Sequence, residues 1–535
     1  MDTFSNQKIQ EVTRSKHDSY ALDLLEKSTT TTEMDGVRRY ATPLLRVPNH
    51  PPLATTTRAV LPLLRGTERR LVKNPELAEV HNREIHNLVK AGYVTEHSTA
   101  TSGDIKAMFH QIRLLPSDTT LLRFIWRDME RDAEPTIYEW QVLPFGTTCS
   151  PCCAIYALQR HAREHPDCDP EVLDSVENAF YVDNCLQSIP STAEAKSLLD
   201  KVRNLLSKGG FEVRQWASNR AEVIQHLPPQ ARSSSSELWL TQSGANPEEP
   251  TLGLRWSCIP DTLGYKHRSS PSKETPTLRT IYRTLASQYD PLGYILPYTT
   301  RAKVLVQDLW QTKRDWDEPI HPADLVERWI CWETELTELS DVQMPRCYVP
   351  SCADQLGSCL ELHVFCDASE RAYGAVSYLR VEDKAGHTHV SFVMARSRVA
   401  PKKQLSMPRL ELSAALSGAQ LASTLRAELT LPIQRVIYWS DSTTVLTWLK
   451  SESCRYKVFV GTRIAEIQDL TEVQDWRYVD SINNPADDVT RGKTLKELAK
   501  PHRWSLGTPF LSQPEKEWPT APRRAPLRNQ LKLMS

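Results

Sequence analysis

The chain of 535 residues lacks several features that mark common classes of protein. No apolar run approaches the ~20 residues of a transmembrane helix, and the start, Met1-Asp2-Thr3-Phe4, does not have the composition of a signal peptide. The twelve cysteines follow no disulfide-framework spacing, which indicates reduced thiols. We therefore expect a soluble, intracellular protein of the cytoplasm or nucleus with no membrane partner.

An excess of charge of one sign is also missing. The net charge is −1 at pH 7, so any binding of nucleic acid must use local basic patches rather than the whole surface. The turn of an aspartic protease, Asp-Thr-Gly or Asp-Ser-Gly, does not occur. Composition therefore names no function.

Two carboxylates in the last third of the chain follow predicted strands. Asp367 ends an alternating apolar run over residues 360–366, which is typical of a half-buried strand. Asp441 ends a second apolar run over residues 436–439, which predicts a buried strand. Strand ends can aim both side chains at a shared point.

Two more carboxylates lie in the first turns of predicted helices. Glu411 follows Ser406-Met407-Pro408 and begins a helix with an apolar stripe. Asp487 follows Asn484-Pro485, a cap and first-turn pair, in a short helix that Gly492 closes. Four convergent carboxylates suit a pair of Mg²⁺ ions about 3.5–4 Å apart, the arrangement that cleaves phosphodiesters. The alternative is that they are four unrelated surface acids.

A second constellation lies nearer the N-terminus. Asp104 precedes an aromatic residue, Phe109, by five positions, and residues 143–146 form a Leu-Pro-Phe-Gly turn. Asp183 occupies a tight turn in Phe180-Tyr181-Val182-Asp183-Asn184, between two short apolar strands. One acid at a strand end and another in a hairpin turn can share two metal ions that hold a nucleoside triphosphate.

The segments around the first four carboxylates resemble the RNase H domain of LTR retrotransposons of the BEL/Pao type. They are His363 to Ser369, Pro408 to Leu412, Tyr438 to Ser442 and Asn484 to Asp487. The resemblance implies a mixed sheet flanked by helices that cuts RNA in RNA–DNA hybrids. It makes Asp367, Glu411, Asp441 and Asp487 ligands of two Mg²⁺ or Mn²⁺ ions. Many members add a histidine near the fourth acid, and none occurs between Glu472 and Gly492.

The second constellation resembles the palm of a reverse transcriptase, again of the BEL/Pao type. The resemblance implies metal binding by Asp104 and Asp183, with two ions in this site as well. Phe109 becomes the steric gate against the ribose 2′-hydroxyl. Phe145, Gly146 and Tyr181 line the nucleotide and template site. An RNA template and a DNA primer are the implied partners.

Two departures from that family affect the polymerase. Asn184 replaces the second aspartate of the turn and becomes a weaker metal ligand. Only residues 95–101 separate the helix before the palm from Ser102, whereas the family has several tens of residues here. A strand pair with its turn needs roughly a dozen residues, so the fingers hairpin that grips the triphosphate is missing. We predict an impaired or inactive polymerase.

The predicted fold is a multidomain α/β protein with five parts. Residues 1–50 form a poorly ordered segment, and residues 51–225 form a truncated fingers remnant, helical over 59–93, with an α+β palm. Residues 226–358 form a linker, thumb and helical connector, and residues 359–495 an RNase H-like mixed-sheet α/β domain. Residues 496–535 form an extended tail.

The predicted function is that of a retrotransposon Pol fragment with RNase H activity and reverse-transcriptase ancestry. A basic stretch, Arg396, Arg398, Lys402 and Lys403, is interpreted as a contact to the nucleic-acid backbone or, equally, as a solvated loop. Other parts of a retroelement polyprotein are expected partners. The alternative function is a non-catalytic nucleic-acid-binding or scaffold relic of a decayed element.

Overall fold

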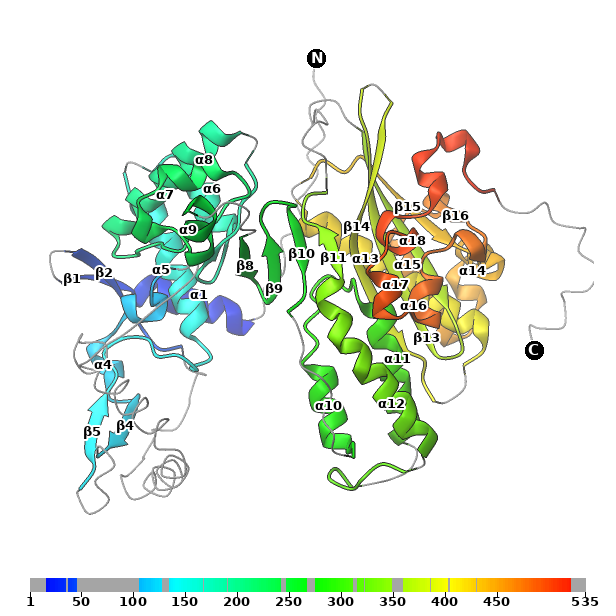
Figure 1. Cartoon of the computed structure of the whole chain (residues 1–535), viewed down its shortest axis with the longest axis horizontal. Coiled ribbons are helices and arrows are strands. Elements are labelled where there is room, and N and C mark those ends of the chain that lie inside the picture. The colour runs from blue at the N-terminus through cyan, green and yellow to red at the C-terminus, as the bar shows by residue number, and fades with distance from the viewer. Residues whose placement is uncertain are drawn as a thin grey trace, which may run out of the picture. The chain divides into compact units, whose positions relative to one another are not determined.

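The structure is a computed structural model in which fourteen stretches of the chain are described. They are residues 16–34, 37–45, 105–127, 134–166, 168–189, 191–241, 247–266, 275–310, 315–321, 323–348, 359–384, 386–402, 405–429 and 431–520. The chain divides into two compact units, residues 1–249 and 250–535 (Figure 1). The predicted helix 59–93, segment 95–101, Asp104 and Lys403 lie outside the described residues. None of the helices in the described stretches is long and apolar enough to cross a membrane.

The first unit is α+β, with helices packed around one core. Its helices are α1 (Lys16–Ser28), α4 (Pro116–Thr119), α5 (Ser150–Glu164), α6 (Pro170–Asn178), α7 (Thr192–Lys208), α8 (Ala221–His226) and α9 (Ser234–Thr241). Its strands are β1 (Thr30–Met34), β2 (Val37–Thr42), β3 (Arg113–Leu114), β4 (Arg123–Trp126), β5 (Thr136–Glu139), β6 (Phe180–Tyr181) and β7 (Asn184–Cys185). The strands form a sheet of order β1-β2-β3 and two hairpins, β4-β5 and β6-β7.

Two stretches of this unit are more ordered than the sequence predicted. Residues 16–34 and 37–45, expected to be poorly ordered, form α1, β1 and β2, and both Leu25 and Tyr40 are fully buried. Tyr40 packs against α5, and the Tyr40 hydroxyl lies 3.4 Å from Nδ1 of His161 on that helix. The expected linker after residue 226 contains α9, where Ser233 Oγ accepts a hydrogen bond from the Ser236 backbone at 3.0 Å.

The second unit is built on a five-stranded mixed sheet of order β14-β13-β12-β15-β16. The strands β12 (Cys359–Ala368), β13 (Ala372–Glu382) and β14 (Thr388–Val399) are antiparallel, whereas β15 (Arg435–Ser440) and β16 (Trp476–Tyr478) continue the sheet in parallel. The parallel register pairs Cys366 with Ser440. The chain therefore leaves β12 and β15 at the same edge of the sheet.

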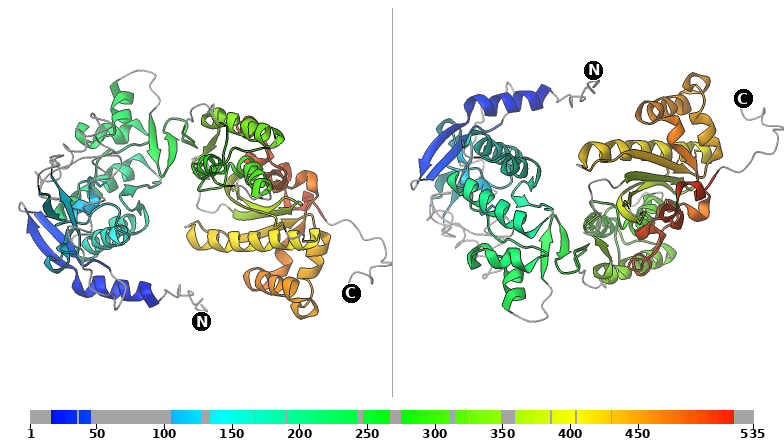
Figure 2. Two further views of the ribbon diagram at one scale, coloured as in Figure 1. Left: turned by 90° about the horizontal axis from the view of Figure 1, so that it is seen from below. Right: turned by 90° about the horizontal axis from the view of Figure 1, so that it is seen from above.

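One face of this sheet is covered by α13 (Met407–Glu428), α14 (Thr443–Leu449) and α15 (Val458–Leu470). Figure 2 shows the yellow α13 on one side of the sheet and the green α11 and α12 on the other. The helix α13 crosses β12 at Gly418, where a Cβ atom would overlap Cys366 Sγ and approach Val364 within 3.3 Å. Only glycine allows this close approach. The predicted apolar stripe of the helix is confirmed.

The other face is covered by the connector and the C-terminal segment, which share one core with the sheet. The connector helices are α10 (Leu278–Ala286), α11 (Leu296–Leu309) and α12 (Ala323–Glu335), and the C-terminal ones are α16 (Asp487–Arg491), α17 (Leu495–Leu498) and α18 (Arg503–Leu506). A small sheet of order β11-β10-β9-β8 comprises β8 (Glu248–Thr251), β9 (Leu254–Ser257), β10 (Thr262–Gly264) and β11 (Gln343–Pro345). Trp329, Trp332, Trp439 and Trp504 are all buried in the shared core.

Two predictions are wrong for this unit. The strand β12 was predicted to be half-buried, but its residues are buried on both faces because the connector covers the second one. Residues 496–520, expected to belong to an extended tail, fold back in short helical turns, and their Trp504 and Leu511 are fully buried. The helical connector itself is confirmed.

Candidate active site

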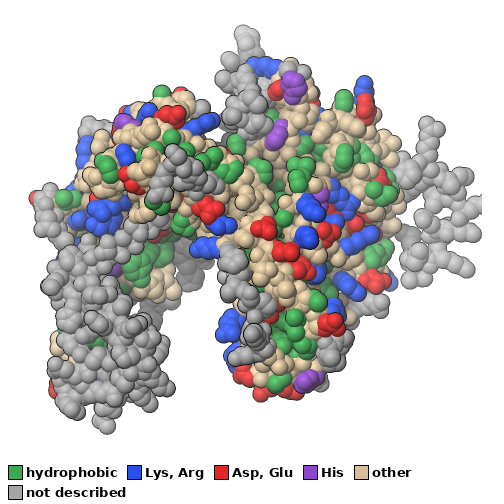
Figure 3. All heavy atoms as spheres, viewed as in Figure 1, with side chains coloured by type: hydrophobic (Ala, Val, Ile, Leu, Met, Phe, Trp, Pro, Cys, Tyr) green, Lys and Arg blue, Asp and Glu red, His purple; other side chains and the backbone are tan. Residues whose placement is uncertain are grey.

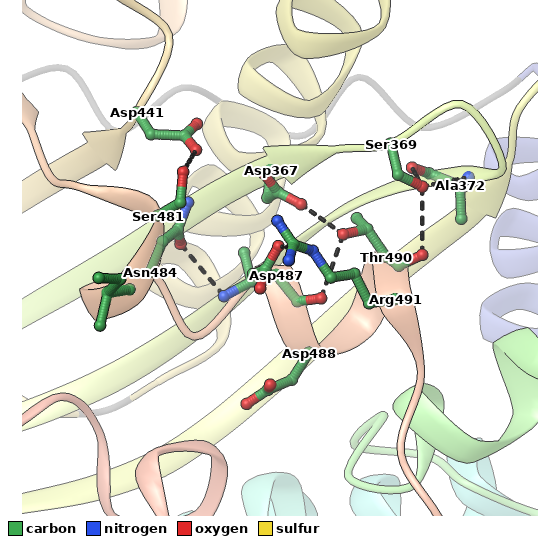
Figure 4. A network of polar contacts seen from close by, with 12 residues as sticks. Asp367, Ser369, Ala372, Asp441, Ser481, Asn484, Asp487, Asp488, Thr490 and Arg491 are labelled. Atoms are coloured by element: carbon green, nitrogen blue, oxygen red, sulfur yellow. Dashed lines mark hydrogen bonds and ion pairs between the residues drawn. The ribbon is translucent and has the colours of Figure 1, made fainter.

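Asp367 and Asp441 lie side by side at the edge where β12 and β15 end. Each follows one member of the register pair Cys366–Ser440, and neighbouring strands are ~4.8 Å apart. Ser481 Oγ donates a hydrogen bond of 2.6 Å to Asp441 Oδ2, and Thr490 Oγ1 donates one to Asp367 Oδ2 (Figure 4). The sheet therefore brings two of the predicted carboxylates together.

Glu411 reaches the same edge from α13. It precedes Gly418 by seven residues, which is two helical turns and ~10 Å along the axis, so both residues lie on the helix face toward the sheet. Ser442, which directly follows Asp441, donates its hydroxyl to Glu411 Oε2. The same hydroxyl accepts a hydrogen bond of 3.3 Å from the Val445 backbone and caps α14.

Asp487 is positioned by a loop that is anchored to β12. Asn484 Nδ2 donates a hydrogen bond of 3.0 Å to the Cys366 carbonyl, and Asn484 Oδ1 accepts one of 3.1 Å from the Ala486 backbone. The Asn484 side chain is fully buried. The predicted short helix follows at once, begins at Asp487 and ends before Gly492, whose φ is 91°.

Burial and mutual repulsion disfavour the ionised carboxylates. Burial raises the pKa of Asp367 to about 7, with contributions from the charges of Asp441 and Asp487, against the hydrogen bond from Thr490. Burial also raises the pKa of Glu411, and the charge of Asp441 adds to it. For Asp487, burial raises the pKa although Arg491 and Arg503 oppose it. These couplings show that the four carboxylates form one electrostatic cluster.

The donor chemistry of the cluster fits Mg²⁺. All four donors are carboxylates, which this cation prefers, and a bound cation would relieve their repulsion. Three of the carboxylates accept a hydrogen bond from a hydroxyl group, and Arg491 Nε lies 2.5 Å from Asp487 Oδ1. Across the described residues, no three His, Cys, Asp or Glu side chains are already gathered as a metal site. The fit therefore rests on donor type and on the shared edge.

The buried Asn484 anchor predicts a measurable effect. Asn484→Ala removes both hydrogen bonds that hold the Asp487 loop on β12, so we expect the Mg²⁺ concentration that half-saturates the carboxylate cluster to rise about tenfold or more. Asn483→Ala is the matched control, because that side chain bonds only the neighbouring Asp480. A Mg²⁺-binding titration checks the effect. Equal midpoints in the two variants would contradict it.

In the first unit, Asp183 occupies a two-residue turn between β6 and β7, as predicted. Val182 in this turn has a φ of 57°, unusual for a β-branched residue. The Asp183 carbonyl accepts a hydrogen bond of 3.0 Å from the backbone of Ile105, and Asn184 Nδ2 donates to Asp183 Oδ1 at 2.8 Å. Asn184 therefore presents its amide nitrogen, not its oxygen, to Asp183.

The predicted nucleotide-site aromatics lie partly together. The rings of Phe109 and Phe145 pack edge to face, with centroids 5.2 Å apart. Phe145 is 64% exposed and Tyr181 is 66% exposed, so both rings are available for stacking. Gly146 has a φ of 88°, which favours glycine after Phe145.

The basic stretch is placed only in part. Arg396 and Arg398 lie on β14, where Arg396 Nη2 donates to Thr424 Oγ1 at 3.3 Å, and Lys402 is exposed. Among the described residues, no hydrogen bond or ion pair joins these side chains to the four carboxylates. The sequence did not single out Thr490, Ser442, Ser481 or Arg503, which contact the carboxylates. Only Ser442 carried a signal, as a cap residue before an apolar run.

Comparison with known proteins supplies the family. Residues 56–216 match the family model of the reverse transcriptase (RNA-dependent DNA polymerase), and residues 277–442 match that of the Pao retrotransposon-like RNaseH-like domain. The chain is 28% identical over 158 residues to the Gag-Pol polyprotein of Woolly monkey sarcoma virus, covering 28% of this chain and 9% of that protein.

A solved structure, that of the foamy viral protease-reverse transcriptase dRH in complex with double-stranded DNA, is 15% identical with a TM-score of 0.39. It covers 71% of this chain and 56% of that one. The two family matches fall on the two units, one on each side of residue 249. The chain therefore carries a reverse transcriptase domain and a Pao retrotransposon-like RNaseH-like domain, and these matches support a Pol protein of the BEL/Pao type.

Proposed function

We propose that the second unit hydrolyses RNA within RNA–DNA hybrids. The observation that carries the proposal is that Asp367, Asp441, Glu411 and Asp487 lie at one edge of a mixed sheet and interact electrostatically. The family matches support it, because both domains belong to Pol proteins. The protein would act in the cytoplasm or nucleus as a piece of a longer polyprotein.

The four carboxylates would hold two Mg²⁺ or Mn²⁺ ions. When bound, such ions supply an activated water and stabilise the leaving oxygen of a phosphodiester. The chain itself supplies positioning. Thr490, Ser442 and Ser481 orient three of the carboxylates by hydrogen bonds, and Asn484 fixes the start of α16. Arg491 and Arg503 balance the charge of Asp487.

The test is cleavage of a labelled RNA–DNA hybrid by the full chain with Mg²⁺ or Mn²⁺. We expect cuts in the RNA strand only, and none in EDTA. A folded protein that binds the hybrid but never cuts it would instead support the non-catalytic relic.

The raised pKa of Asp367 predicts a pH dependence of metal binding. Because that pKa is about 7, the carboxyl group is largely neutral at pH 6, and a cation must displace its proton. The raised pKa values of Glu411 and Asp487 act in the same direction. We expect the Mg²⁺ midpoint of cleavage to fall as the pH rises through about 7. Midpoints that do not change between pH 6 and pH 8 would contradict this expectation.

For the first unit we propose polymerase ancestry with little or no remaining activity. Asp104, Asp183 and Asn184 would hold the ions, and Phe109, Phe145, Gly146 and Tyr181 would line the nucleotide site. In the second unit, the nucleic-acid backbone would be contacted near the RNase H site by a basic stretch, Arg396, Arg398, Lys402 and Lys403. The short segment 95–101 leaves no room for the hairpin that grips the triphosphate.

We therefore expect no extension of a DNA primer on an RNA template by the purified chain. Loss of the charge-assisted contacts of the fingers removes on the order of a few kcal/mol of triphosphate binding. A gel-based extension assay beside an active reverse transcriptase checks this. Extension that stops after Asp183→Asn would overturn the proposal.

A further inference from the structure

A cleft of about 430 Å³ lies in the second unit, next to the fourth carboxylate. Its walls come from α11, α12, the turn between β12 and β13, and the end of α16. Its charged side chains are four arginines and one glutamate: Arg301, Arg328, Arg371, Arg491 and Glu327. In a chain with a net charge of −1, this is a local basic site. Figure 3 shows acidic and basic side chains interspersed elsewhere on the visible face.

The four arginines differ in how many hydrogen bonds and ion pairs they form within the protein. Arg301 is held by two hydrogen bonds of 2.8 Å to Glu335 and by one of 3.2 Å to the Lys493 carbonyl. Arg328 contacts no acidic side chain of the described stretches except Asp308, at 3.6 Å, and its own side chain is 48% exposed. Within the described part of the chain, Arg371 has no acidic partner at ion-pair distance and is exposed. Arg328 and Arg371 therefore have donors to offer to a ligand.

The cleft adjoins the carboxylate cluster through two of its lining residues, Thr490 and Arg491. Thr490 lines the cleft and donates its hydroxyl to Asp367, while Arg491 lines the cleft and pairs with Asp487. Trp332 and Leu305 form an apolar part of the wall. Apolar surroundings lower the effective dielectric and strengthen the attraction between arginine and an anion. A strand laid over the carboxylates would carry phosphate groups past this cleft.

We propose that the cleft binds a backbone phosphate of the nucleic-acid strand held at the carboxylate site. The inference rests on the proposed RNase H function and names a contact of its substrate. The planar fork of arginine matches phosphate oxygens, and Arg328 and Arg371 approach from the connector and from the sheet. The connector thus forms part of the substrate-binding surface. Free phosphate has the same chemistry and is the other possible source.

The test compares the double variant Arg328→Ala/Arg371→Ala with the unaltered full chain. Binding of a labelled RNA–DNA hybrid is measured by fluorescence anisotropy, with Ca²⁺ in place of Mg²⁺. We expect Kd to rise about tenfold, and the slope of log K against log salt to become smaller by about one per lost phosphate contact. Arg279→Ala is the matched control, because Arg279 pairs with Asp317 on the connector outside the cleft. Thermal unfolding verifies that all variants fold.

Each outcome decides the proposal. Equal Kd values and equal slopes in the double variant and the control overturn it. Stabilisation of the unaltered chain by inorganic phosphate, lost in the double variant while hybrid binding is unchanged, assigns the cleft to free phosphate and also overturns it. If the unaltered chain never cuts the hybrid but the double variant binds it more weakly, the cleft proposal is supported and the RNase H proposal fails. If the unaltered chain cleaves the hybrid and the double variant binds it with an unchanged Kd, the RNase H proposal is supported and the cleft proposal fails.

Discussion

Asp367→Asn is expected to lower RNase H cleavage by on the order of 10²–10³-fold while hybrid binding is kept. Asparagine has the shape of aspartate and can still accept the hydrogen bond from Thr490. It removes one negative charge from the point where the charges of Asp441 and Asp487 also act. The cluster then holds cations less well, whereas basic side chains that contact the strand are untouched.

A second readout separates this effect from misfolding. The folded-state pKa of Asp367 is raised to about 7, above its ordinary value of 3.8, so the free energy of unfolding of the metal-free protein falls as the pH rises from about 4 to about 7 and stays lowered above 7. Asp367→Asn should therefore raise Tm in EDTA at pH 8 but not at pH 4, while lowering cleavage. The exposed Asp469 on α15 provides the control substitution, Asp469→Asn. Full cleavage by the Asp367 variant would contradict its assigned role.

The elements that carry the site could be predicted because their patterns are local. The runs that end at Asp367 and Asp441 form β12 and β15, and the helices at Glu411 and Asp487 are present. Strand ends and helix first turns are set by residues a few positions apart. Their convergence depended on the parallel register of β12 and β15, which the family resemblance implied and local pattern did not.

The double burial of β12 could not be predicted from alternation. Glu361 and His363 lie between its apolar residues, and polar residues in such places are usually solvent-facing. Here they are buried because Arg380 pairs with Glu361 at 2.9 Å and Trp439 Nε1 donates to His363 Nδ1 at 3.1 Å. Buried polar residues with such partners have the same sequence pattern as the exposed face of a strand.

The contacts that orient the carboxylates could not be predicted from the sequence either. Thr490 bonds Asp367 across 123 positions, and Ser481 bonds Asp441 across 40. A serine or threonine has no sequence signal for so distant an acceptor. The C-terminal turns were missed for a related reason. Apart from the adjacent Phe510 and Leu511, their apolar residues stand singly among prolines and polar residues, without a period of either 2 or 3.6.

Termination of the chain after Lys500 is expected to prevent folding of the second unit. It removes four large side chains from the core that the connector, the sheet and the C-terminal segment share: Trp504, Phe510, Leu511 and Trp518. Each is at most 6% exposed, and burial of such a side chain contributes roughly 1.5–3 kcal/mol. Together they account for much of the about 5–15 kcal/mol by which a typical domain is stable. The hydrogen bond of 2.7 Å from Trp504 to the Tyr294 carbonyl would also be lost.

A chain that ends after Thr520 is the matched control, since it keeps all four side chains and omits only residues 521–535. We expect it to unfold cooperatively in urea, and the chain ending at Lys500 to show a weak or absent transition for this unit. Arg503 makes the loss functional as well as structural, because it pairs with Asp487 at 3.3 Å and with Asp488 at 2.7 Å. A folded, fully active protein ending at Lys500 would show that the connector alone covers the sheet and positions α16.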